Sequence, residues 1–190
     1  MASGSKRTKS LRALFGQIPD NDEILNILFD LTTQTDRTAA IVGGAILEDR
    51  LRRSIALYLR TDLTDDDQSS LFEDRGPLTD FDAKIRIAYC LGMLSRENKQ
   101  DFDHIRRIRN GFAHSIPHHD FEAVGIRTIC EDLWIINHNK FVNQTQISTF
   151  MGTKALYILA IGLYHWMLTI HQPPLAVSDI IAAHLLPPSP

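Results

Sequence analysis

Residues 102–115 read FDHIRRIRNGFAHS, and this stretch indicates an amphipathic α-helix. Its apolar residues lie three or four positions apart: Phe102, Ile105, Ile108 and Phe112. That spacing is the period of one buried helical face. Pro117 disfavours helical geometry at Ile116, so we expect the helix to end near Ser115. The stretch therefore predicts a helix that lies against a core along one side.

The same helical period recurs through most of the chain. We predict helices at residues 21–31, 35–60, 79–94, 98–115, 120–136 and 146–171. The expected N-caps, whose side chains can accept a hydrogen bond from the first turn, are Asn21 or Asp22, Thr79 and Asn98. Residues 62–67 indicate an acidic connection, and residues 75–77 a turn. No window alternates like a β-strand, so the predicted fold is a single all-α domain of six or seven helices.

Length and composition fit one soluble domain. The chain has 190 residues, 44% hydrophobic and 23% charged, and its 20 basic and 23 acidic residues give a net charge of −3. These values exclude collagen-like, disulfide-scaffold and wholly disordered chains, and they do not indicate a globally basic nucleic-acid binder. We expect a flexible basic tail at residues 1–18, the helical domain at 19–172 and a proline-rich irregular tail at 173–190. Cys90 and Cys130 lie in apolar runs and are expected to be buried free thiols, as in a cytoplasmic protein.

One segment raises the question of a membrane. Residues 155–170 read ALYILAIGLYHWMLTI, which is shorter than the ~20 residues that a span needs and contains His165. We therefore expect no membrane span but a core or interface helix. Its apolar residues occupy nearly every side of the helix, more than one small core covers, so we predict a homodimer or a partner interface.

Two charged residues stand where the helical pattern expects apolar ones. Glu48 lies on the stripe of the second predicted helix, and Arg109 lies beside the stripe of the fourth. Because an unpaired buried ion is far costlier than a paired one, we predict that Glu48 and Arg109 contact each other. Gly43 and Gly44 support a close approach of the two helices, since glycine inside a helix usually has a packing reason.

The segment RNGFAH, residues 109–114, carries the clearest chemical signal. Asn110 and His114 are four positions apart and share a helix face, whereas Arg109 and His114 are about 140° apart on a regular helix. Their joint action would thus need a distorted last turn or a partner subunit. An arginine, an amide and a titratable histidine suit a phosphodiester, because arginine binds the oxygens and histidine transfers protons.

Histidines are frequent here without forming a metal pattern. The histidines nearest this segment are His104, His114, His118 and His119. None reproduces a recognised ligand spacing, and no nucleotide-binding motif is present, so we expect no metal and no cofactor.

Four motifs occur in an order that resembles the mannitol operon repressor family of bacterial regulators. They are AILEDRLR, LFEDRGPL, AKIRIAYCLGML and FDHIRRIRNGFAHS. The resemblance is strong over residues 41–115 and weaker over the last two helices. It implies a compact all-helical protein that is assigned to transcriptional regulation and lacks a recognisable DNA-reading module. No helix-turn-helix signature precedes the predicted core.

The RNGFAH segment also resembles the Arg-x-x-x-x-His motif of HEPN domains, helical dimers that include metal-independent ribonucleases. This resemblance implies a HEPN-like bundle in which Arg109 and His114 form the catalytic pair. Asn110 would be the accompanying amide and Glu48 a supporting carboxylate. The implied reaction uses the 2′-hydroxyl of RNA as the nucleophile, which DNA lacks.

Together these observations predict a repressor-like cytoplasmic regulator, whose expected partners are a second copy of the chain and a regulatory protein or RNA. With a net charge of −3 and no reading helix, we expect only weak, non-specific binding to duplex DNA. Two alternatives stay open: a HEPN-type ribonuclease or toxin, and a non-catalytic protein-interaction module. The expected binding residues are the same in each case: Glu48, Arg109, Asn110 and His114.

Overall fold

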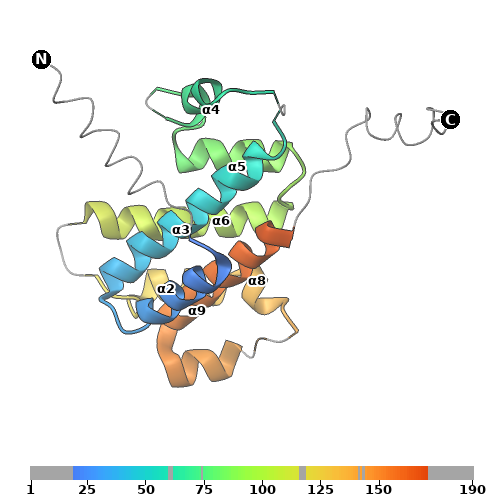
Figure 1. Ribbon diagram of the computed structural model, residues 1–190. Helices are drawn as coiled ribbons and strands as arrows, with labels where there is room; N and C mark the ends of the chain where they lie inside the picture. The colour runs from blue at the N-terminus through green and yellow to red at the C-terminus, as the bar shows by residue number, and fades with distance from the viewer. Residues whose placement is uncertain are drawn as a thin grey trace, which may run out of the picture.

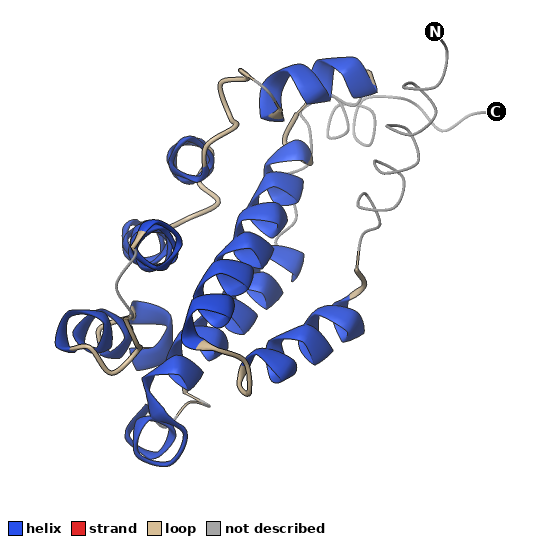
Figure 2. Cartoon of the chain, turned by 90° about the vertical axis from the view of Figure 1, so that its left-hand side faces the viewer, coloured by secondary structure: helices blue, strands red, loops and turns tan. Residues whose placement is uncertain are grey.

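The computed structural model describes residues 19–59, 62–73, 75–115, 119–140, 142 and 144–170, with the backbone alone for 144–150. Every regular element in these ranges is a helix, as Figure 2 shows. The helices are α2 (Asn21–Leu31), α3 (Asp36–Ala56), α4 (Asp65–Phe72), α5 (Phe81–Cys90), α6 (Arg96–His114), α7 (Val124–Glu131), α8 (Trp134–Asn137) and α9 (Gln144–Ile170). The all-α prediction is therefore confirmed. The two predicted tails lie outside the described residues.

Helices α3 and α9 form the centre of the molecule. They pack on each other more extensively than any other pair, and α3 also crosses α5 and α6, as seen in Figure 1. Helix α2 lies over α3 and α9, while α7 and α8 pack against α9. The largest fully buried side chains come from both central helices and their neighbours: Leu47, Leu51, Phe102, Ile105, Phe121, Tyr157 and Tyr164. One continuous core therefore joins the helices.

Helix α3 buries a wider face than the sequence indicates. The predicted stripe includes Ala45, which is exposed, whereas Ala40, Gly43 and Leu47 are buried. The reason is that α3 packs on α9 along one side and on α5 and α6 along another. Small residues at the contacts let three helices approach it.

Three predicted N-caps are wrong by one to three positions. The observed N-caps of α2, α5 and α6 are Asp20, Asp80 and Ser95. In α6 the Ser95 hydroxyl accepts a hydrogen bond from the Asn98 N–H at 3.1 Å, so the helix starts one turn before the predicted cap. Its other end is confirmed, because Ser115 is the C-cap.

The predicted acidic connection at residues 62–67 is wrong, because helix α4 begins there. The Thr64 hydroxyl accepts from the Asp67 N–H at 3.2 Å, and the Asp67 carboxylate accepts from the Thr64 N–H at 3.0 Å. This reciprocal capping box starts the helix, and the acidic residues of its first turn complement the helix dipole. The carboxylates that looked like a solvated link are thus a helix start.

The predicted fifth helix is two helices, α7 and α8. The chain breaks between them because the carboxylate of Asp101 on α6 accepts the N–H groups of Trp134 and Ile135, each at 3.0 Å. Asp101 is almost fully buried, and it also accepts a hydrogen bond from the hydroxyl of Tyr164 at 2.6 Å. A buried carboxylate therefore caps a helix that lies distant in sequence.

The long apolar helix α9 contains a break in its backbone. Gly152 has φ 77° and ψ 175°, which separates the first turns from the helix that follows. Residues 151–170 are long and apolar enough to cross a membrane, yet half of that stretch is buried inside the molecule. One of its faces fills the core, with Leu156, Ala160 and Leu168 fully buried. The prediction of a core helix over residues 155–170 is confirmed.

The two cysteines differ in environment. Cys130 is buried as predicted, and burial raises the pKa of its thiol to about 12. Cys90 is exposed, so its predicted burial is wrong, because it is the last residue of α5 and faces away from the core. Both thiols are free.

Candidate functional site

Glu48 on α3 binds Arg109 on α6, as the apolar patterns predict. The Oε2 atom of Glu48 lies 3.3 Å from an Nη2 atom of Arg109. The side chain of Glu48 is 17% exposed and that of Arg109 is 29% exposed, so Arg109 is less buried than predicted. The pair therefore joins two central helices but leaves part of the guanidinium facing outwards.

Lys84 completes this cluster, and sequence reasoning missed it. Its Nζ donates hydrogen bonds to Glu48 Oε1 at 2.7 Å and to the carbonyl of Thr79 at 2.6 Å. The Lys84 side chain is only 5% exposed. One carboxylate thus binds two cations from two helices, and Lys84 is the more buried partner. The signal available in the sequence was the position of Lys84 next to Ile85 on the buried face of α5.

Gly44 gives Arg109 the room to lie against α3. A Cβ atom built on Gly44 would be 2.9 Å from both Cβ and Cγ of Arg109, closer than real side chains approach. Gly43 faces the other way, where a Cβ would lie 2.6 Å from Cδ1 of Ile161 on α9. The predicted close approach of α3 and α6 is therefore confirmed at Gly44, while Gly43 serves the contact with α9.

Arg109, Asn110 and His114 all line one polar groove of about 540 Å³ between α5 and α6. Helix α6 continues to His114 and ends at Ser115, so this convergence needs no distorted last turn within α6. The other residues of the groove wall come mainly from the start of α5: Asp80, Phe81, Asp82, Arg86 and Arg106. The groove thus brings together the three residues of the RNGFAH segment.

Asp82 organises the opposite wall of the polar groove. Its carboxylate lies 2.7 Å from a nitrogen of Arg86 and 3.2 Å from a nitrogen of Arg106. Arg106 also lies 3.5 Å from Asp103 on the same helix. These ion pairs hold two arginines at the groove, and sequence reasoning found neither: Arg86 pairs with Asp82 on its own helix, whereas the contact of Arg106 with Asp82 joins α6 to α5.

The polar groove can bind an anion. Its wall holds three arginines against two aspartates, and Glu48 lies behind Arg109. Within the described part of the chain, the side chains of Asn110 and His114 have no hydrogen-bond partner, and Arg109 uses only one of its nitrogens. Arginine can bind two oxygens of a phosphate at once, so the free donors suit a phosphate oxygen. In the same ranges, no cluster of three or more potential ligands could hold a metal ion.

Comparison with known proteins places most of this site in one family region. The family model described as the mannitol repressor matches residues 64–169, which is more than half of the chain. The match includes Lys84, Arg109, Asn110 and His114, whereas Glu48 lies before it. It extends through the last helices, where the resemblance looked weaker, and it leaves out the motif AILEDRLR. No curated protein and no solved structure matches the chain.

Proposed function

The chain belongs to the mannitol repressor family, and from this we propose that it is a cytoplasmic repressor-like regulator that acts through a protein or RNA partner. The proposal that it acts through a partner, and does not itself read a DNA sequence, is supported by the ion pairs of its basic residues. A protein that follows the DNA backbone needs basic side chains that are free to neutralise phosphates.

Five of the seven basic residues of α5 and α6 are bound to carboxylates of the same molecule, whereas Arg96 and Arg107 are exposed and have no salt bridge within the described residues. The five pairs are Lys84 to Glu48 at 2.7 Å, Lys99 to Asp103 at 2.7 Å, Arg86 to Asp82 at 2.7 Å, Arg106 to Asp82 at 3.2 Å and Arg109 to Glu48 at 3.3 Å. A phosphate would have to compete with these carboxylates at each position. Together with the net charge of −3, this pairing is the observation that supports weak and non-specific binding to duplex DNA.

Selection from a pool of random DNA duplexes tests this proposal. We expect the purified protein to enrich no sequence, and its residual binding to fall steeply as salt rises, as purely electrostatic binding does. Enrichment of one sequence that is bound tightly at physiological salt would overturn the proposal.

The polar groove favours a second candidate function, that of a metal-independent ribonuclease. The favouring observation is that Arg109, Asn110 and His114 line one groove, with donors free for a phosphodiester. In this function Arg109 binds the phosphate oxygens, and His114 takes the proton of the 2′-hydroxyl as its oxygen attacks the phosphorus. The bond from phosphorus to the 5′-oxygen breaks, the 5′-oxygen leaves with a proton from water, and a 2′,3′-cyclic phosphate remains. Glu48 would orient Arg109 from behind.

RNA cleavage in the presence of a metal chelator tests the second candidate. The substrate is a single-stranded RNA, compared with the same strand carrying 2′-deoxy sugars, which lacks the nucleophile. Cleavage that His114→Ala abolishes, and that the exposed histidine variant His119→Ala keeps, would support an enzyme. No cleavage by the wild type, or equal cleavage by both variants, would reject it.

A further inference from the structure

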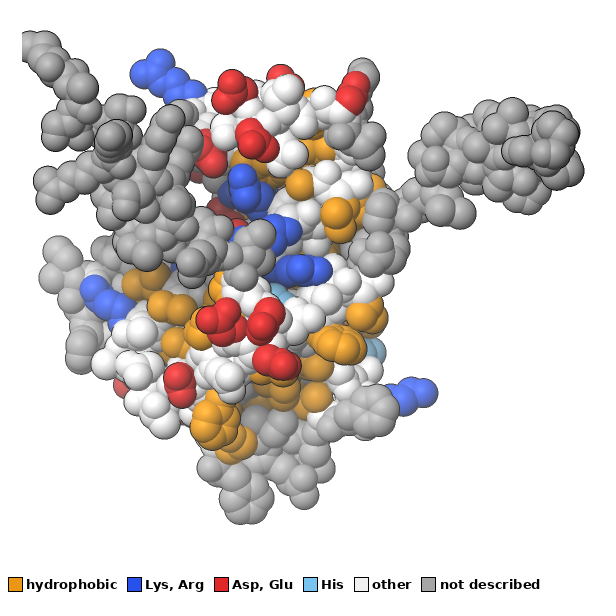
Figure 3. Space-filling model, in the orientation of Figure 1, with side chains coloured by type: hydrophobic (Ala, Val, Ile, Leu, Met, Phe, Trp, Pro, Cys, Tyr) orange, Lys and Arg blue, Asp and Glu red, His pale blue; other side chains and the backbone are white. Residues whose placement is uncertain are grey.

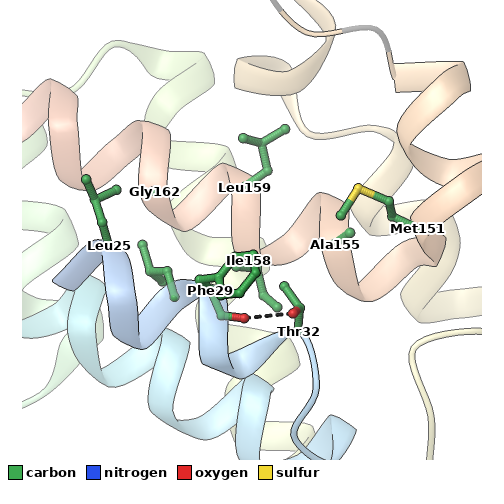
Figure 4. A pocket seen from close by; sticks show the side chains of 9 residues that line it. Leu25, Phe29, Thr32, Met151, Ala155, Ile158, Leu159 and Gly162 are labelled. Atoms are coloured by element: carbon green, nitrogen blue, oxygen red, sulfur yellow. Dashed lines mark hydrogen bonds between the residues drawn. The ribbon is translucent and has the colours of Figure 1, made fainter. Parts of the chain in front are cut away.

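A second groove, between α2 and α9, is almost purely apolar and has no partner in the described part of the chain. We call it the α2–α9 groove, and it has a volume of about 350 Å³. Its principal residues are Leu25, Phe29, Met151, Ala155, Leu159 and Gly162. Figure 4 shows these side chains reaching the groove from the two helices. The polar groove uses none of them.

The walls of the α2–α9 groove are unusually exposed for apolar side chains. Phe29 is 74% exposed, Met151 62% and Leu25 61%. Between them, Ala155 and Gly162 form a floor of small residues on α9. A hollow with protruding apolar walls matches the apolar face of a helix, whose side chains at intervals of three and four residues fill such a groove.

The apolar stripe continues along α9 beyond the groove. Ala155, Leu159, Gly162, Trp166 and Ile170 are three or four residues apart within the helix that follows Gly152 and therefore share one face, while Met151, before the break, lines the same groove. Trp166 and Ile170 are each 59% exposed. From Ala155 to Ile170 the stripe covers 16 residues, or about 22 Å at 1.5 Å per residue, so it can accompany a helix of about four turns.

The rim of the groove decides which occupant fits. Residues 19–36 contain five acidic residues and no Lys or Arg: Asp20, Asp22, Glu23, Asp30 and Asp36. Asp36 is paired with Lys154 at 3.1 Å, whereas Asp22, Glu23 and Asp30 are exposed and have no salt bridge within the described part of the chain. Acidic side chains lie beside hydrophobic ones on this face in Figure 3. Helix α2 is therefore negative beside the groove, with Asp22 one turn from Leu25 and with Glu23 and Asp30 farther round the helix.

We propose that the α2–α9 groove binds a basic amphipathic helix of a partner protein. The apolar face of that helix fills the groove, and its flanking Lys and Arg side chains meet the acidic rim of α2. Opposite charges across an interface favour the pairing and steer it. A second copy of this chain fits less well, because it would bring two acidic α2 rims onto one shared face. The proposal rests on the proposed action through a protein partner.

Synthetic helices test this proposal with the full chain. The probe is a dye-labelled peptide of about 18 residues, or about five turns, with leucines on one face and lysines beside them. A matched peptide carries glutamate in place of every lysine. We expect the lysine peptide to bind at least about tenfold more tightly by fluorescence anisotropy. Equal affinity for the two peptides would overturn the proposal.

Variants place the binding in the groove. Phe29→Ala and Gly162→Leu should each weaken the lysine peptide at least about tenfold, because one removes a wall and the other fills the floor. Val124→Ala is the matched control, since Val124 is 70% exposed on α7 and should bind like the wild type. The variant Asp22→Lys, at the exposed acidic residue one turn from Leu25, should reduce the preference for the lysine peptide. The proposal would be overturned if Val124→Ala bound the lysine peptide as weakly as Phe29→Ala does. It would also be overturned if the charge substitution on α2 left the preference for the lysine peptide unchanged.

Light scattering tests whether a second copy of this chain, rather than a partner helix, occupies the α2–α9 groove. A wild-type dimer that Phe29→Ala converts to monomers, with no binding of the lysine peptide, would assign the face to a second copy and overturn the proposal. Failure of the proposed function is distinguishable, because it is read from selection of DNA sequences and not from peptide binding.

Discussion

The hydroxyl of Tyr164 donates a 2.6 Å hydrogen bond to the buried carboxylate of Asp101. The same carboxylate accepts the two N–H groups at the start of α8. Three helices, α6, α8 and α9, therefore meet at one acidic side chain. Burial, followed by the charge of Asp101, raises the pKa of Tyr164, so the phenol stays a donor through the physiological range.

Removing Asp101 should destabilise the protein more than removing its phenol donor. Asp101→Ala leaves the N–H groups of Trp134 and Ile135 without their acceptor and the Tyr164 hydroxyl with only a 3.4 Å bond to Asn98, and it should lower the free energy of unfolding by about 3 kcal/mol. Tyr164→Phe removes one hydrogen bond to a charged group and should cost about 1.5–3 kcal/mol. Urea denaturation measures both values. Tyr157→Phe is the control, because Tyr157 donates to the neutral carbonyl of Ala40 and should cost about 1 kcal/mol.

Loss of Glu48 should be more damaging than loss of Arg109. Glu48→Ala leaves the buried Lys84 without its carboxylate and should cost about 3–5 kcal/mol. Arg109→Ala should cost no more than about 1 kcal/mol of ion-pair energy, because its guanidinium reaches solvent. Adding Lys84→Met to Glu48→Ala should recover much of the lost stability, since it removes the unpaired charge. Additive effects of the Glu48 and Lys84 substitutions in chemical denaturation would contradict the direct contact.

Gly44 and Gly111 should respond oppositely to alanine. A methyl group at Gly44 meets the stem of Arg109, so Gly44→Ala should destabilise the protein by about 1–3 kcal/mol. A methyl group at Gly111 meets nothing within 4 Å, so Gly111→Ala should stabilise α6 by about 0.5–1 kcal/mol. Thermal unfolding distinguishes the two signs. A stabilising Gly44→Ala would mean that α3 and α6 do not approach as closely as described.

The two thiols should react at different rates. Cys90 is exposed and should react with a disulfide reagent in the native protein, whereas Cys130 should react only after unfolding in urea. The measurement is the number of cysteine thiols per chain that react with the reagent before and after urea is added. Cys90→Ser should remove the fast phase alone.

Cys130 also gives a pH dependence. Its pKa is about 12 in the folded chain, against an ordinary value near 8.5, so the folded state favours the neutral thiol. This contribution to stability is complete below about pH 8.5 and is lost as the pH rises towards 12. Burial raises the pKa values of Tyr157 and Tyr164 in the same direction. Denaturation at increasing pH should therefore show falling stability on the alkaline side. Unchanged stability between about pH 8 and 11 would contradict it.

The sequence predicts those features that depend on local periodicity and on single strong signals. Pro117 placed the end of α6 correctly, and the apolar stripes located the contact of Glu48 with Arg109. The burial of Lys84 was not predicted, because a lysine beside apolar residues is usually exposed. Only the fold shows that α5 turns this side chain towards Glu48. The partner of a charged residue on another helix cannot be found from spacing alone.

Tertiary contacts explain the wrong helix boundaries. The break between α7 and α8 is made by Asp101, which lies more than 30 residues earlier in the chain. The sequence between Asp120 and Ile136 holds no proline that would mark the break. The sequence also did not predict that Arg109 and His114 line one groove without a distorted helix end. The reason is similar, because residues of α5 complete the groove that α6 begins.

The position of α9 has a consequence for synthesis on the ribosome. Helices α2 and α3 precede α9 by about 100 residues, yet their buried faces pack on it. Until α9 leaves the exit tunnel, the apolar side of α3 around Gly43 lacks Tyr157 and Ile161 and has only Leu31 of α2 beside it. A nascent chain that pauses before residue 151 thus presents open apolar surface, the condition in which chains aggregate or recruit chaperones. The last of the described helices to be translated is the one that closes the core.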